Sequence, residues 1–168
     1  MAASKTSRAV ADAFDEQAAR EKCLRLLARR ARSAAELRDR LRRVGFADEV
    51  AEAVLSDLER VGLVNDEEFA RSWVANRQPS GRAGRRKLRW ELQKKGIAQD
   101  LIGRIVDGEV DDEMEMRAAM AVAQRRLRDR PAAKTDVARL RRLLVGRGFE
   151  FETVNSVLQR VADEGEHL

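Results

Sequence analysis

The chain has 168 residues, of which 34 are Lys or Arg and 29 are Asp or Glu, so its formal net charge is +5. Hydrophobic residues make up 43% of the chain, enough for a packed core, and charged residues make up 38%, too many for a chain embedded in a membrane. The single cysteine, Cys23, excludes an internal disulfide, and one histidine, His167, is too few for a zinc site of Cys and His ligands. The low aromatic content, with only 2 prolines, favours helices over strands, so we expect an all-α protein.

Residues 1–13 are rich in Ala and Ser and lack the apolar stretch of a secretion signal, which predicts a loose tail on a cytoplasmic protein. The longest apolar run, 118–123, is far shorter than the roughly 20 residues that cross a bilayer. We therefore expect no membrane as a partner.

Beyond the tail, apolar residues recur at i, i+3, i+4 and i+7, which is the spacing of one helix face. Ser33 and Asn65, each followed three residues later by Glu, fit a capping pair and indicate helix starts. Gly62 and Gly108 are expected to end helices. The spacing predicts nine helices, at about 14–30, 33–44, 47–61, 65–77, 81–95, 98–107, 111–129, 134–146 and 150–163.

These helices fall into three copies of one unit, because the same apolar residues recur at a period of 51 and then 52 residues. A Gly is expected to end the middle helix of each copy. Units of this size bury too little apolar surface alone, so neighbouring units should stack. The prediction is an elongated, curved array of three tandem three-helix repeats, at 14–62, 63–108 and 109–164. The matched residues include Leu37, Leu41 and Gly45, then Leu88, Leu92 and Gly96, then Leu140, Leu144 and Gly148.

Charge alternates in sign between the predicted helices, because the middle helix of each repeat is basic and the third is acidic. Stacked repeats should therefore align a basic ridge and an acidic ridge. Solvated helix faces and ion pairs between helices explain most such charge runs. The segment 77–97, however, contains eight basic residues and one acidic residue. A binding partner is the simpler explanation for this excess of positive charge.

Two features of the middle helices indicate contacts with a partner. Arg38 corresponds to Arg89 and Arg141, the one charged position of this helix that keeps its residue in all three copies, and it is expected at the edge of the buried face. Trp90 lies about 200° around the helix from Leu88, among cations. It either stacks on a base, anchors a protein interface or fills the seam to a neighbouring repeat.

Other aromatic and sulfur-bearing residues are expected in the core. Phe69, Trp73 and Val74 follow helical spacing, and Cys23 lies in the apolar phase of the first helix. We expect Cys23 to be a buried, unreactive thiol.

Catalytic chemistry finds little support. His167 is the second-last residue, so no histidine base is available within the folded part. The acidic residues 111–115 open a predicted helix, where carboxylates favour the helix dipole. A metal-dependent nuclease built on 109–115 is therefore a remote alternative, and no catalytic residue, metal or cofactor is expected.

A resemblance to a known family is carried by 62–74, GLVNDEEFARSWV, and by 84–97, GRRKLRWELQKKGI. Both stretches are similar to the signature of the RecX family of bacterial recombination regulators, and 36–46 also fits. The resemblance covers about 16–163 and includes the three tandem three-helix units of that family.

This resemblance implies a monomeric, non-enzymatic protein that binds RecA, chiefly as a filament on single-stranded DNA. It also implies inhibition of RecA ATP hydrolysis, strand exchange and coprotease activity, which modulates recombination and the SOS response, and binding to single- and double-stranded DNA. An array lying in the filament groove would bridge its protomers. The candidate contact residues are Arg38, Arg82, Arg85, Arg86, Lys87, Arg89, Trp90, Lys94, Lys95, Arg141 and Arg142.

The alternative is a module of helix-turn-helix type that binds naked DNA, because each basic middle helix is followed by a Gly turn and another helix. The helix after the turn would enter the major groove, but in the first repeat it carries Asp48, Glu49, Glu52 and Asp57. Phosphate groups would repel it.

Overall fold

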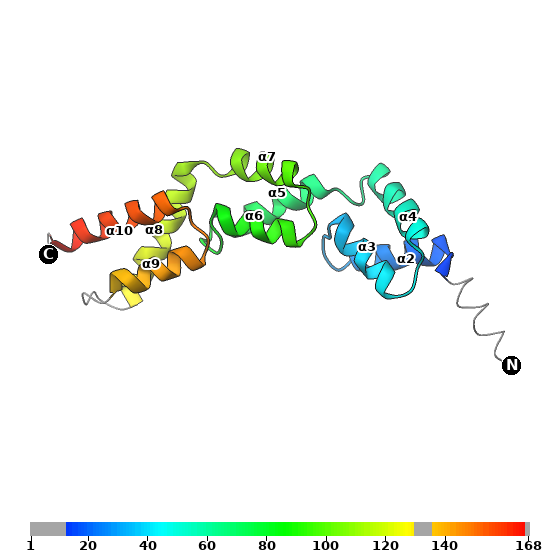
Figure 1. The fold of residues 1–168 in the computed structure, drawn as a ribbon, viewed down its shortest axis with the longest axis horizontal. Coiled ribbons are helices and arrows are strands. Elements are labelled where there is room, and N and C mark those ends of the chain that lie inside the picture. The colour runs from blue at the N-terminus through cyan, green and yellow to red at the C-terminus, as the bar shows by residue number, and fades with distance from the viewer. Residues whose placement is uncertain (1–12, 130–135, 167–168) are drawn as a thin grey trace. The chain divides into compact units, whose positions relative to one another are not determined.

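The computed structural model describes residues 13–129 and 136–166, so most of the expected tail, Pro131 and His167 lie outside the described residues. Within the described part of the chain the regular structure is entirely helical (Figure 1). The all-α prediction is therefore confirmed. The helices are α2 (Glu16–Leu27), α3 (Ala34–Arg43), α4 (Asp48–Arg60), α5 (Asp66–Arg77), α6 (Arg85–Lys94), α7 (Gln99–Glu109), α8 (Asp112–Asp129), α9 (Asp136–Gly146) and α10 (Phe151–Glu166).

The helix starts follow the capping signals of the sequence. Ser33 Oγ accepts a hydrogen bond from the Glu36 amide at 3.2 Å, and Asn65 Oδ1 accepts one from the Glu68 amide at 3.0 Å. Each bond satisfies an N–H that the first helical turn leaves without a partner. Asp111 Oδ1 does the same for α8.

The predicted helix boundaries differ from the observed ones by as much as four residues, and two of these differences have a visible cause. Gly108 lies inside α7, which continues to Glu109, because Glu109 forms an ion pair with Arg71 and Val110 is fully buried after it. The sixth predicted helix begins at Arg85 rather than at residue 81, because a turn closed by the Gly81 N–H on the Gln78 carbonyl precedes it.

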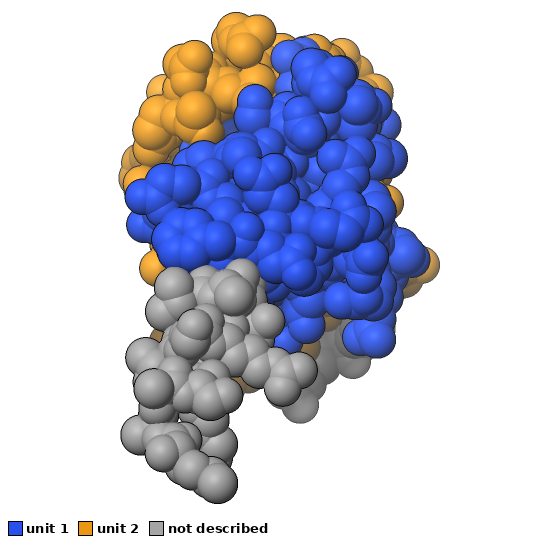
Figure 2. Space-filling view, turned by 90° about the vertical axis from the view of Figure 1, so that its right-hand side faces the viewer, with its two compact units in different colours: residues 1–69, 95–97 blue, residues 70–94, 98–168 orange. Residues whose placement is uncertain are grey.

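The fold divides into two compact units. The described residues up to 69, with 95–97, form the first unit, and 70–94 with the described residues from 98 onward form the second (Figure 2). In the first unit α2, α3 and α4 pack on one another. Their contact side bears the apolar residues predicted for this role, among them the fully buried Cys23. Burial raises the pKa of the Cys23 thiol, so the prediction of an unreactive cysteine is supported.

In the second unit α6 packs on α7, and α8, α9 and α10 pack around a core that includes Leu140, Leu144 and Phe149.

Phe69 and Val74 are buried as predicted, but Trp73 is only half-buried. Its indole Nε1 donates to Glu91 at 2.9 Å, because an indole N–H needs a polar partner where it leaves water.

Two backbone hydrogen bonds within the second unit fix the start of α6. The Gly84 N–H donates to the Arg147 carbonyl at 2.8 Å, and the Arg86 N–H donates to the Gly148 carbonyl at 3.0 Å. The first turn of α6 is thereby held against the turn that follows α9. This contact sets which residues of α6 face outward.

Candidate functional site

The outer face of α6 combines cations with an exposed indole. Arg86, Trp90 and Lys94 are spaced four residues apart and share one face, and Lys87 adjoins it. Leu88 and Leu92 are fully buried on the opposite side, which forces Trp90 outward to 56% exposure. We call Arg86, Lys87, Trp90 and Lys94 the basic–aromatic surface.

A shallow cavity of about 430 Å³ adjoins this surface, lined by Arg86, Lys87, Trp90 and the residues around Gly146 at the end of α9. Lys94 Nζ lies 5.6 Å from the centroid of the Trp90 ring, within the range of a cation–π contact. Of the three roles predicted for Trp90, filling a seam between repeats does not agree with its exposure. Stacking on a base or anchoring a protein interface both remain consistent with it.

Arg85, on the same helix, pairs with carboxylates instead. Arg85 Nε lies 2.7 Å from Glu115 Oε2, and its Nη2 lies 2.5 Å from Asp112 Oδ1. Burial opposes a charge on Arg85, but the hydrogen bond to Asp112 and the charge of Glu115 outweigh it and raise the pKa of the guanidinium. Arg85 is therefore held in an internal ion pair.

The repeated arginine position has an internal role in all three copies. Arg38 forms a two-bond pair with Glu52, and Arg141 Nη1 donates to Asn155 Oδ1 at 3.1 Å. Both partners lie 14 residues further along the chain, on the third helix of the same repeat. Arg89 has Gly103 at that distance, so it pairs with Asp107 one turn further on, and with Glu150 at 3.0 Å. The arginine thus ties each middle helix to the helix that follows it.

The remaining candidate contact residues also divide into one that forms an ion pair and two that do not. Lys95 Nζ pairs with Glu36 Oε1 at 2.6 Å, within the first unit. Arg82 and Arg142 are exposed and form no ion pair within the described residues. The structure therefore brings together Arg86, Lys87, Trp90 and Lys94 as an outward group, and commits Arg38, Arg85, Arg89 and Lys95 to carboxylates.

Glu115 is a buried partner of Arg85 that was not predicted from the sequence. Its side chain is completely buried, and it accepts from Arg85 Nε, from the Arg85 amide at 3.3 Å and from the Glu150 amide at 2.9 Å. No local pattern indicates these partners, since they lie 30 and 35 residues away. Within the described residues no group of carboxylates, histidines or cysteines is arranged to hold a metal ion.

The fold and this surface together define an all-helical protein of three-helix domains with a cationic, aromatic face. The model of the first three-helix domain of RecX matches residues 19–58, and the model of the second matches 65–104. The chain belongs to the RecX family. None of its described helices has the length and apolar content that crossing a bilayer demands.

Relatives support this assignment over most of the chain. The regulatory protein RecX of Mycobacterium avium is 41% identical over 131 residues, covering 78% of this chain and 75% of the relative. That of Streptomyces lividans is 36% identical over 157 residues, covering 89% and 82%. The crystal structure of RecX from Lactobacillus salivarius superposes with a TM-score of 0.77 at 18% identity, covering 88% of this chain and 97% of that one.

Proposed function

We propose that this protein regulates RecA by binding the RecA filament on single-stranded DNA, and that it thereby inhibits ATP hydrolysis, strand exchange and coprotease activity. Membership of a family of regulatory proteins supports a regulatory role. The protein acts as a non-enzymatic monomer that modulates recombination and the SOS response.

The observation that carries the proposal is the basic–aromatic surface. Arg86, Lys87 and Lys94 form no ion pair within the described residues, whereas Arg85 and Arg89 on the same helix are neutralised by carboxylates. Uncompensated cations beside an exposed indole suit a partner made of DNA phosphate, bases and acidic protein side chains. We therefore propose that this face of α6 contacts the filament.

The first experiment measures ATP hydrolysis by the cognate RecA on preformed single-stranded DNA filaments, with this protein added well below one molecule per RecA. Suppression at that ratio requires an action on the filament rather than competition for DNA. No suppression, together with salt-sensitive binding to naked DNA, would favour the alternative of a helical DNA-binding module.

The contact surface is tested by changing Arg86→Glu, Lys87→Glu and Lys94→Glu together. We expect at least tenfold weaker inhibition, because three attractive contacts become repulsive. The matched control is Arg104→Glu, Arg125→Glu and Arg160→Glu, which makes the same change of net charge at exposed positions of the second unit. Full inhibition by the α6 variant, or equal loss in the control, would show that the contact lies elsewhere.

A further inference from the structure

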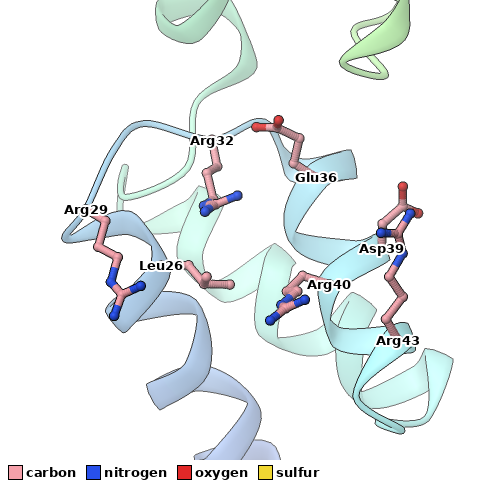
Figure 3. A pocket seen from close by; sticks show the side chains of 7 residues that line it. All are labelled: Leu26, Arg29, Arg32, Glu36, Asp39, Arg40 and Arg43. Carbon is pink, nitrogen blue, oxygen red and sulfur yellow. The ribbon is translucent and has the colours of Figure 1, made fainter.

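The first unit contains a polar cavity that the regulatory proposal does not use. It has a volume of about 420 Å³, lies between the end of α2 and one face of α3, and is lined by Leu26, Arg29, Arg32, Glu36, Asp39, Arg40 and Arg43. Figure 3 shows the side chains of Arg32, from the segment before α3, and of Arg40, from α3, both pointing toward the region of Leu26. Four arginines thus surround a space large enough for a small ligand.

The two carboxylates of the lining leave most of this positive charge uncompensated. Glu36 is already bound by Arg30, at 3.0 Å, and by Lys95, at 2.6 Å. Asp39 lies beside Arg43 at the far side of the cavity (Figure 3). Neither carboxylate bonds Arg32 or Arg40.

Arg32 is in an unfavourable position for a cation. Its Nε atom is buried and has no hydrogen-bond partner within the described residues. Burial lowers the pKa of the guanidinium, and the nearby charges of Arg30, Arg40 and Arg29 lower it further, against the opposing effect of Glu36. Native proteins seldom leave a buried donor without an acceptor, and such groups concentrate where a ligand binds.

We propose that this cavity binds a phosphate group, with Arg32 and Arg40 as its principal ligands and Arg29 and Arg43 at its rim. A guanidinium presents paired N–H donors that match the oxygens of a phosphate, and convergence of several guanidiniums favours an anion of more than one charge. The phosphate belongs either to a free nucleotide or to the backbone of a nucleic-acid strand. The site consists of first-unit residues alone, so its test is independent of the test of the basic–aromatic surface.

The test is calorimetric titration of the full chain with inorganic phosphate, with ADP and with an oligothymidylate lacking terminal phosphates. Arg32→Met and Arg40→Met, each tested alone, should weaken binding at least tenfold, because a charge-assisted hydrogen bond to phosphate is lost while the aliphatic volume is kept. Arg25→Met is the control, since Arg25 is an exposed residue of α2 outside the cavity. It should bind like the unaltered protein.

The three ligands separate the two phosphate sources. Binding of phosphate and ADP that Arg32→Met and Arg40→Met weaken assigns the cavity to a free phosphorylated molecule. If these variants weaken binding of the oligonucleotide alone, the cavity is assigned to a strand phosphate, because the strand can also bind the basic–aromatic surface. Binding of none of the three ligands, binding that Arg32→Met and Arg40→Met leave unchanged, or equal weakening by Arg25→Met would overturn the proposal. None of these outcomes affects the test of RecA inhibition by the α6 variant.

Thermal unfolding without ligand supplies a second, independent readout. If Arg32 serves a ligand, Arg32→Met should unfold at the same or a higher temperature than the unaltered protein, because it removes a buried donor that lacks an acceptor. Phosphate should then raise the unfolding temperature of the unaltered protein and not that of the variant. A clear drop in the unfolding temperature of the ligand-free variant would mean that Arg32 is a structural residue and would contradict the proposal.

Discussion

Glu36 shows how a single carboxylate can organise one end of a helix. It lies in the first turn of α3, where a negative charge favours the helix dipole, and its oxygens accept from Arg30 Nη1 at 3.0 Å and from Lys95 Nζ at 2.6 Å. Burial opposes its ionisation, but these hydrogen bonds outweigh burial and lower the pKa of Glu36 to about 2. The ionised form is therefore the one that stabilises the fold.

We expect Glu36→Gln to lower the free energy of unfolding at pH 7 by about 2–3 kcal/mol, because the folded pKa lies well below the ordinary value. This stabilisation is complete above the ordinary carboxyl pKa and is lost as the pH falls toward about 2, so the difference between the two proteins should narrow between pH 5 and pH 3. Urea unfolding at several pH values measures it. Glu21→Gln, at an exposed residue of α2, is the control, and a difference independent of pH would contradict this account.

At the scale of helices, the contact between α6 and the turn after α9 requires a close approach of their two backbones. Gly148 has a φ of +74°, and a Cβ built there would lie 2.5 Å from the Lys87 Cβ and backbone nitrogen. The backbone hydrogen bonds of Gly84 and Arg86 to this turn require that approach. A side chain at this position would push the turn away from α6.

Gly148→Ala should destabilise the protein by about 2–4 kcal/mol, from the left-handed backbone conformation and from the contact with Lys87 together. Gly62→Ala isolates the first effect, because Gly62 has the same φ of +74° and a Cβ there meets no atom within 4 Å. It should cost about 1–2 kcal/mol. Equal losses in the two variants, measured by urea unfolding, would show that the contact with Lys87 is readily relieved.

The helices could be predicted because their signals are local. The capping pairs at Ser33 and Asn65 and the spacing of buried leucines act within a few residues, and the structure confirms them. Ion pairs between helices have no such signal. Arg85 and Arg89 could be recognised as a basic run, but Glu115 and Glu150, which neutralise them, come 30 and 61 residues later. The outward group of cations could therefore be separated from the inward group only once the packing of α6 was known.

For the molecule as a whole, the alternation of charge has a structural use within each unit. The basic middle helix pairs with acidic residues of the following helices, as in Arg42 with Asp48 and Arg85 with Asp112. Much of the predicted basic ridge is thereby neutralised internally. Other cations form no ion pair within the described residues, and two groups of them line cavities, one on α6 and one in the first unit.

The three unpaired cations of the basic–aromatic surface predict the salt dependence of binding to naked single-stranded DNA. If Arg86, Lys87 and Lys94 each contact a phosphate, changing all three to Gln should reduce the slope of log K against log salt concentration by roughly 2. Fluorescence anisotropy with a labelled oligothymidylate between about 50 and 200 mM salt measures this slope. An unchanged slope would mean that other cations bind the strand.

The distribution of two rare residue types gives the protein a pair of built-in reporters. Its one cysteine, Cys23, is fully buried in the first unit, whereas both tryptophans, Trp73 and Trp90, belong to the second. A thiol reagent can modify Cys23 only when the first unit opens, so the labelling rate measures that opening. Tryptophan emission follows the second unit alone. The unfolding of each unit can therefore be followed separately without any substitution in the sequence.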